Sequence, residues 1–153
     1  MGFLTDGVRR LLHDSGFPGM KVIQFAFDSR EESDYLPHNY EKNCVVYTGT
    51  HDNDTLCGWY KVLDPEDLKL SQKYMNNANT PKRQIHWDFI RLALASVADL
   101  CIIPLQDYLG LGSEARINTP STLGNNWRWR MTQGCLTKEL ADQIRELTTL
   151  YGR

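Results

Sequence analysis

No run of 18 consecutive apolar residues occurs in this sequence of 153 residues, so no segment is long enough to cross a bilayer as a helix. The four cysteines form no C-x-x-C pair, which disfavours a zinc site or a thiol-redox site, and we expect reduced thiols. The amino terminus lacks a basic region followed by an apolar run. These absences together predict a cytoplasmic protein without a membrane segment.

A strong excess of positive charge is also missing. The chain has 17 Lys and Arg against 19 Asp and Glu, a net charge of −2, and this balance disfavours a nucleic-acid partner. The motifs G-x-S-x-G, G-x-x-x-x-G-K-[ST] and G-x-G-x-x-G do not occur, so serine hydrolases, P-loop nucleotidases and classical dinucleotide enzymes are disfavoured. His38 and His86 each stand alone without a second ligand at metal spacing, so we assign both a structural role and expect no metal.

Helix-like and strand-like segments alternate from end to end, which is typical of an α/β fold. Apolar runs of strand length cover residues 22–27, 44–47 and 101–105, and they fit strands that are buried on both faces. Between and around them, capping residues mark the starts of four helices. We therefore predict three parallel strands linked by helical crossovers, with helix starts at Thr5, Asp64-Pro65, Thr80-Pro81 and Thr137.

Long connections follow each predicted strand, over residues 28–43, 49–63 and 106–136. Connections of this length in a compact domain are usually functional, and in parallel α/β folds they lie at the carboxyl ends of the strands, where ligands bind. A sheet of only three strands is narrow and has two open edges. Either further strands escape the pattern or the chain is part of a larger fold.

The loop from Tyr47 to Thr55 places the imidazole of His51 and the carboxylates of Asp52 and Asp54 close together after the second strand. One interpretation is a site that binds hydroxyl groups and stabilises positive charge. The other is a turn in which Asp and Thr side chains bond to the backbone. Spacing alone favours the turn, because such turns are common.

The segment Asn126-Trp127-Arg128-Trp129-Arg130 could stack on bases, stack on sugar rings or pack inside the protein. In an extended strand Trp127 and Trp129 face one side, and Arg128 and Arg130 face the other. That separation favours packing of the indoles with salt bridges from the arginines.

Taken together, these segments resemble the C-terminal part of 4-alpha-glucanotransferases of the amylomaltase or disproportionating-enzyme type, glycoside hydrolase family 77. The resemblance covers almost the whole chain and departs from the family pattern only slightly, with Ile117 in place of Met and Ser121 in place of Gly. The matching segments are Phe17 to Phe27, Tyr47 to Thr55 with Gly58-Trp59, Pro104 to Gly110, Arg116 to Pro120, and Asn126 to Arg130.

The resemblance implies a (β/α)8 TIM barrel of which residues 1–153 form a single partial unit, with strands six to eight and their helices. It thereby accounts for the narrow sheet and makes the N-terminal half of the barrel an expected partner. The implied activity is transfer of α-1,4-glucan segments between maltooligosaccharides by a retaining mechanism, without a cofactor. The glucans would derive from starch or glycogen.

The resemblance also assigns roles to single residues. Asp52 matches the carboxylate that stabilises the oxocarbenium-like transition state, and His51 matches its hydroxyl-binding neighbour. Asn118 and Phe27 match positions on the acceptor side, whereas Arg116 is expected to shape its loop. The nucleophilic Asp and the acid/base Glu of the family precede the context matched by Gly2 to Thr5. The chain alone is therefore predicted to be inactive, with a glucan-binding or assembly module as the alternative.

Overall fold

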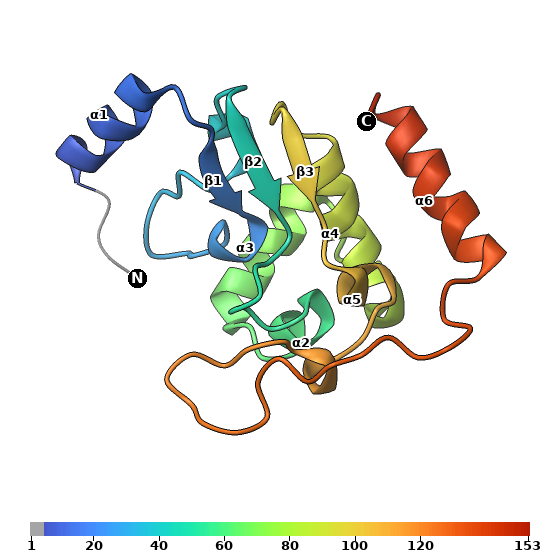
Figure 1. Cartoon of the computed structure of the whole chain (residues 1–153). Coiled ribbons are helices and arrows are strands. Elements are labelled where there is room, and N and C mark those ends of the chain that lie inside the picture. Colours follow the sequence, from blue (N-terminus) through green and yellow to red (C-terminus); the bar gives the residue numbers. More distant parts are fainter. Residues whose placement is uncertain (1–4) are drawn as a thin grey trace.

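A computed structural model describes residues 5–153, and the context around Gly2 to Leu4 lies outside the described residues. Its centre is a three-stranded parallel sheet in the order β1-β2-β3 (Figure 1). The predicted three parallel strands are thus confirmed. The strands are β1 (Gly19–Val22), β2 (Cys44–Tyr47) and β3 (Leu100–Ile102), and the α-helices are α1 (Asp6–Ser15), α2 (Leu56–Lys61), α3 (Pro65–Met75), α4 (Ile85–Leu94), α5 (Leu105–Tyr108) and α6 (Lys138–Leu150).

Three of the four predicted helix starts are confirmed by their capping geometry. The side chains of Thr5, Asp64 and Thr137 accept hydrogen bonds from backbone N–H groups in the first turns of α1, α3 and α6. These bonds satisfy donors that have no partner within the helix. At the other end of α1, Gly16 adopts the left-handed conformation with φ of 71°, which a residue with a Cβ adopts less readily.

The fourth helix start is displaced from the predicted Thr80-Pro81. The backbone N–H of Thr80 donates to the carbonyl of Asn77 over 2.9 Å and closes a turn. A short 3-10 helix, Lys82–Gln84, follows, and α4 begins only at Ile85. The predicted inner stripe of this helix is largely confirmed, because Ile85, Phe89 and Ala93 are buried while Leu92 is half-buried.

The first and third strands differ from their predicted extents. β1 ends at Val22, and Ile23–Phe25 forms a 3-10 helix whose side chains are still mostly buried. An apolar run indicates that a segment is buried, but it does not distinguish a strand from a buried 3-10 helix. β3 stops at Ile102, because Pro104 precedes α5 and the proline ring favours the start of a helix.

Two connections also depart from the prediction. The link from β1 to β2 was expected to be a helical crossover, but within the described residues it contains only the 3-10 helices Ile23–Phe25 and Pro37–Asn39. By contrast, the predicted loop 49–63 contains the six-residue helix α2, which the sequence pattern missed. The side chain of Thr55 caps that helix by accepting from the N–H of Gly58.

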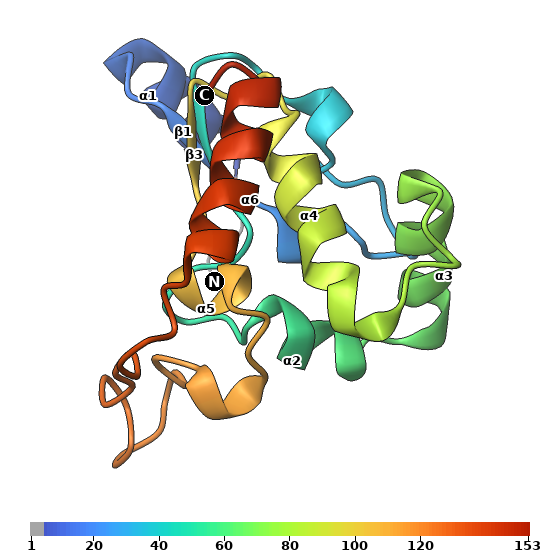
Figure 2. The same ribbon diagram turned by 90° about the vertical axis from the view of Figure 1, so that its right-hand side faces the viewer.

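The helices α3 and α4 lie on one side of the sheet, as the view in Figure 2 shows. Phe89 of α4 is fully buried there and packs edge-on against Trp59 and Phe27. The other face of the sheet carries exposed apolar side chains, among them Leu100 and Ile102, which are 56% and 46% exposed. One face of the sheet is therefore a core, and the other is an uncovered apolar surface.

The helix α6 is fixed at its far end by Arg153. Its guanidinium donates to the carbonyl of Leu94, the last residue of α4, and to the carbonyls of Ser96 and Ala98, which follow the helix. Leu147 of α6 is buried in the same core as α4. Among residues 5–153, no helix is both long enough and apolar enough to cross a membrane.

Candidate active site

The loop after β2 is shaped by side chains that bond to its own backbone. The Oδ1 atom of Asn53 accepts from the N–H and the hydroxyl of Thr50 over 3.0 and 2.8 Å. The Oδ1 atom of Asp54 accepts from the N–H of Thr55 over 2.8 Å. The turn interpretation thus holds for these residues. It does not account for His51 and Asp52, whose side chains point to other partners.

The carboxylate of Asp52 contacts Asn118 and His51 through one of its two oxygens. Its Oδ1 accepts from the Nδ2 of Asn118 over 2.6 Å and lies 3.2 Å from the Nε2 of His51. Its Oδ2 has no hydrogen-bond partner among the described residues, and the side chain is 48% exposed. The carboxylate is therefore held in one orientation while one oxygen stays open to a ligand.

Two loops far apart in the sequence are joined at this point by Arg116. Its Nη2 donates to the carbonyl of Asp52 over 2.7 Å, and its Nε donates to the carbonyl of Asn118 over 2.9 Å. The N–H of Asn118 in turn donates to the carbonyl of His51 over 3.0 Å. Arg116 thus shapes the site through the backbone, and a guanidinium suits this role because its donors are fixed in a plane.

Trp127 covers the ring of His51, with the two ring centroids 5.1 Å apart. Its backbone is held by a 2.7 Å bond from its N–H to the carbonyl of Ile117, and its φ is 62°, which is uncommon for a residue with a bulky side chain. The predicted packing with salt bridges is wrong here. Trp127 is 58% exposed, and Arg128 and Arg130 donate to neutral oxygens within their own segment.

Beneath the loop lies the buried carboxylate of Asp107, which is 2% exposed. Its Oδ2 accepts from the hydroxyl of Thr48 over 2.6 Å, and its Oδ1 accepts from the N–H of Leu56 at the start of α2 over 2.8 Å. Burial raises the pKa of Asp107 to about 6, although these two bonds act in the opposite direction. Asp107 therefore fixes both ends of the loop that contains Asp52.

A further hydrogen bond connects the loop that contains Asp52 to the segment before Arg116. The hydroxyl of Ser113 donates to the Oδ2 of Asp54 over 2.6 Å. Gly58 faces this pair so closely that a Cβ there would lie 2.4 Å from the Ser113 Oγ. The contact between the two loops therefore requires glycine at this position.

Two cavities have predicted site residues in their walls. One of about 230 Å³ is lined by His51, Arg116, Asp107 and their neighbours. The other, of about 710 Å³, is lined by Phe27 with several carboxylates, and its lining does not include His51, Asp52 or Asn118. Phe27 is 3% exposed and packs on the buried aromatic core. The structure thus brings together three of the four predicted site residues and places Phe27 at a separate cavity.

His38 and His86, the two histidines for which the sequence predicts a structural role, lie outside this arrangement. The Nδ1 of His38 is 3.0 Å from the hydroxyl of Tyr74, and His86 is buried beside Trp87. Burial lowers the pKa of His86 and favours its neutral form. Their positions agree with the structural roles expected from the sequence.

Two contributors were not singled out as site residues by sequence reasoning. Asp107 was one polar residue among many after the third strand, and only its burial shows its role. Trp127 was expected to pack inside the protein. The sequence signal for either residue is weak, because both act through distant partners. Asp107 lies 51 positions from Leu56 and 59 from Thr48, and Trp127 lies 76 positions from His51.

Comparison with known proteins matches residues 1–137 to the family model described as 4-alpha-glucanotransferase. The whole chain is 49% identical to a 4-alpha-glucanotransferase of Clostridium butyricum and 46% identical to one of Arabidopsis thaliana. It spans 31% and 27% of the length of these two relatives.

Solved structures give the same result. An amylomaltase from Streptococcus agalactiae in complex with acarbose matches all of the chain with a TM-score of 0.92 and 37% identity, over 31% of that protein. An amylomaltase from Corynebacterium glutamicum shares the fold alone, with a TM-score of 0.71 and 13% identity over 97% of this chain and 28% of that one. The family match covers most of the chain and agrees with these relatives, so this chain belongs to the 4-alpha-glucanotransferase family.

Proposed function

We propose that the chain supplies the charge-stabilising and hydroxyl-binding part of a 4-alpha-glucanotransferase active site. This proposal rests on the geometry of the Asp52 carboxylate. Its Oδ1 is held by Asn118 and His51, whereas its Oδ2 has no partner among the described residues and the side chain is half exposed. An oriented carboxylate with one free oxygen can accept from sugar hydroxyls. It can also stabilise the positive charge that develops in glycosyl transfer.

The retaining mechanism of this chemistry needs two more carboxyl groups. A nucleophile and an acid/base lie about 5 Å apart across the scissile bond, and the transition state between them resembles an oxocarbenium ion. Asp52 acts as a third carboxylate whose interaction is strongest when that charge is largest, so it lowers the barrier more than it strengthens ground-state binding. The resemblance places the other two groups in earlier barrel strands.

In this proposal, the residues around Asp52 have distinct roles. His51 is held by the indole of Trp127 and presents a ring nitrogen beside the carboxylate, where it binds a sugar hydroxyl. Asn118 positions Asp52 and contributes to the acceptor side. Phe27 belongs to the acceptor side of the larger cavity, where carboxylates and apolar rings line the same wall.

The substrate class in this proposal is a maltooligosaccharide or a longer glucan from starch or glycogen. The macromolecular partner is the remainder of a (β/α)8 barrel, of which β1, β2 and β3 form strands six to eight. Supporting this, Leu100 and Ile102 leave an apolar sheet face uncovered. The interior of such a barrel is filled by apolar side chains from its strands.

The test is binding of maltoheptaose to the 153-residue chain, followed by amide chemical shifts. We expect shifts at residues 50–53 and 116–118, and at least about tenfold weaker binding in Asp52→Asn, since hydrogen bonds to charged groups contribute roughly 1.5–3 kcal/mol. The matched control is Asp99→Asn, whose carboxylate lies on the surface 3.9 Å from Lys42. Equal weakening in both variants, or no shifts in the loop, would refute the proposal.

The chain alone is proposed to lack transferase activity, because a single carboxylate of the three cannot carry the covalent steps. Incubation with maltotriose should therefore give no longer or shorter products. Measurable disproportionation by the purified chain would overturn this part.

A binding or assembly module without catalysis is the second candidate. It is favoured by the bonds of Arg116, which hold the Asp52 loop within this chain alone. Cooperative unfolding of a monomer that is stabilised by maltoheptaose would support such a module. A broad transition indifferent to the sugar would mean that the site requires the rest of the barrel.

A further inference from the structure

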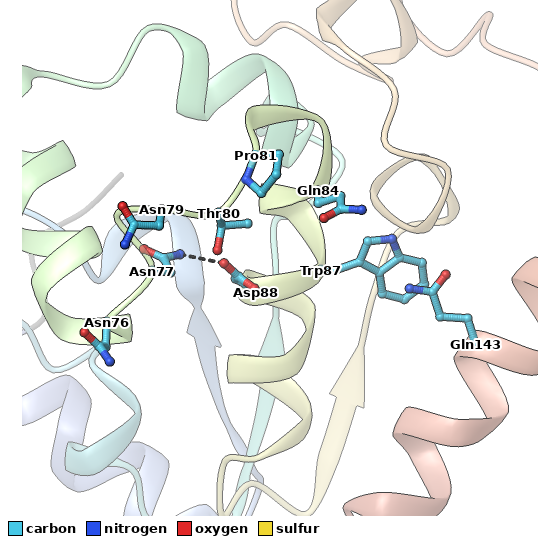
Figure 3. A pocket seen from close by; sticks show the side chains of 9 residues that line it. All are labelled: Asn76, Asn77, Asn79, Thr80, Pro81, Gln84, Trp87, Asp88 and Gln143. Carbon is cyan, nitrogen blue, oxygen red and sulfur yellow. Dashed lines mark hydrogen bonds between the residues drawn. The ribbon is translucent and has the colours of Figure 1, made fainter.

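A third cavity, of about 580 Å³, has no lining residue in the Asp52 loop and shares none with the two cavities described above. It is formed where the segment after α3 turns into α4 and where α6 approaches from the side (Figure 3). One continuous stretch, residues 76–88, thus forms most of the opening, and Gln143 of the distant helix α6 completes it. The lining residues are Asn76, Asn77, Asn79, Thr80, Pro81, Gln84, Trp87, Asp88 and Gln143.

The side chains of this pocket are unusual in composition. Five of the nine lining residues carry amides, one carries an indole and one a carboxylate, and none is a lysine or an arginine. A pocket without a cation and with one carboxylate disfavours phosphates and other anions. A single carboxylate is also too few for Ca²⁺ or Mg²⁺, which bind through several oxygen ligands. The composition suits a neutral ligand with many hydroxyl groups.

One amide in the pocket is held in place and still lacks a donor. Asn77 is 8% exposed, and its Nδ2 donates to the Oδ2 of Asp88 over 2.9 Å. Its Oδ1 has no hydrogen-bond partner among the described residues, and Figure 3 shows that atom turned away from Asp88 toward Asn79. This acceptor is fully covered, and a buried acceptor without a donor is costly. A movement of the exposed Asn79 side chain that lets a hydroxyl or a ligand-bound water reach it is therefore favoured.

The indole of Trp87 supplies the apolar part of the wall. Its ring is half-buried and contacts the rings of His86 and Tyr108, at centroid distances of 5.5 and 5.9 Å. These neighbours fix the ring while part of it still faces the pocket, opposite Gln143 of α6 (Figure 3). A fixed aromatic face next to amides matches a pyranose ring, which has an apolar C–H face and a rim of hydroxyls.

We propose that this pocket, here named the α4–α6 pocket, is an accessory site for a neutral oligosaccharide, and that its ligand is a segment of the same α-1,4-glucan. The identity of the glucan rests on the proposed function, whereas the preference for a neutral polyol rests on the pocket itself. A glucan held here and at Asp52 is bound at two points. The second contact then forms at high effective concentration, so long chains bind more tightly than short ones.

The test uses the 153-residue chain labelled with ¹⁵N and titrated with maltoheptaose. The Trp87 indole N–H and the Asn79 amide report on the α4–α6 pocket, and the amides of residues 50–53 report on the Asp52 loop. We expect shifts in both groups. The variants Asn79→Ala and Gln143→Ala remove exposed amides without opening the core. Each is expected to weaken binding at Trp87 by about two- to tenfold, typical of a neutral hydrogen bond, with no change at the loop.

A matched control is Gln133→Ala, which removes an exposed amide from the segment before α6, outside the α4–α6 pocket. Shifts at the loop without shifts at Trp87 would overturn the accessory site and leave the proposed function standing. Shifts at Trp87 without shifts at the loop would support the site and contradict the function. Tighter binding of a sulfated oligosaccharide than of maltoheptaose at Trp87 would contradict a neutral ligand.

Discussion

The Nδ2 of Asn118 donates to the Oδ1 of Asp52 over 2.6 Å, across a separation of 66 positions in the sequence. This bond selects which oxygen of the carboxylate is left for a ligand. The same two loops are joined by the N–H of Asn118 and the carbonyl of His51. The orientation of Asp52 is therefore a property of two loops together.

Replacing Asn118 should weaken glucan binding without unfolding the chain. In Asn118→Ala the carboxylate loses its anchor, and we expect about three- to tenfold weaker binding of maltoheptaose by titration calorimetry. Asn118→Asp should bind more weakly still, because a second carboxylate repels the first. The control is Asn125→Ala, whose side chain bonds only to Arg128 among the described residues. A loss in the control as large as in Asn118→Ala would contradict the anchoring role.

Arg116→Lys should loosen the contact between the two loops. A lysine has one compact ammonium group in place of the two separate nitrogens, Nε and Nη2, that hold the carbonyls of Asn118 and Asp52 in a fixed geometry. We expect hydrogen exchange at the amide of Asn118 to become faster by about tenfold or more, since each 1.4 kcal/mol changes an opening equilibrium tenfold. Arg128→Lys, in the exposed neighbouring loop, serves as the control. Unchanged exchange in Arg116→Lys would show that the backbone bonds alone hold the loops.

The buried carboxylate of Asp107 should make stability depend on pH. Its pKa is raised to about 6 by burial, so between about pH 4 and pH 6 the folded chain retains a proton that the unfolded chain has released. The free energy of unfolding therefore falls as the pH rises through this window. Asp107→Asn lacks the charge, its Oδ1 can still accept from the N–H of Leu56, and its Nδ2 can donate to the hydroxyl oxygen of Thr48.

We expect the stability of Asp107→Asn relative to the wild type to grow with pH across that window, by up to about 3 kcal/mol. Urea unfolding at several pH values measures the difference. Asp107→Leu is the companion variant, and it should be less stable than Asp107→Asn because it leaves both donors unpaired. A constant difference between wild type and Asp107→Asn from pH 4 to 7 would contradict this account.

The uncovered face of the sheet should make the chain self-associate. Leu100 and Ile102 lie side by side in register with Val45 and Tyr47 of β2, and together they expose an apolar surface. Ile102→Glu should reduce concentration-dependent association in sedimentation velocity. Leu123→Glu changes a fully exposed residue in a distant loop and should have no effect. Monomeric wild-type chain at all concentrations would contradict the prediction.

The sequence was informative where a local signal decides the structure. The caps Thr5, Asp64 and Thr137 were identified because capping needs a side chain beside its own helix. The short helix α2 was missed because its start is fixed partly by Asp107, which lies 51 positions away from Leu56. The run 22–27 was predicted as one strand because a buried 3-10 helix has the same apolar composition.

The difference between local and long-range signals also explains which residues of the site could be predicted from the sequence. His51 and Asp52 were visible as a polar cluster after a strand, and the resemblance added Asn118. That Trp127 covers His51 could not be foreseen, because its backbone adopts a φ of 62° instead of the extended geometry that alternation assumes. A contact between loops 76 positions apart leaves no periodic pattern in the sequence.

Arg153 bonds through its guanidinium to the carbonyl of Leu94, at the end of α4, and to the carbonyls of Ser96 and Ala98, which follow it. All three acceptors are backbone atoms, whereas all three donors belong to one side chain. Substitutions at positions 94, 96 and 98 therefore leave the acceptors in place, and substitution of Arg153 alone removes every donor. Helix α6 then depends more strongly on its packing, such as that of the buried Leu147.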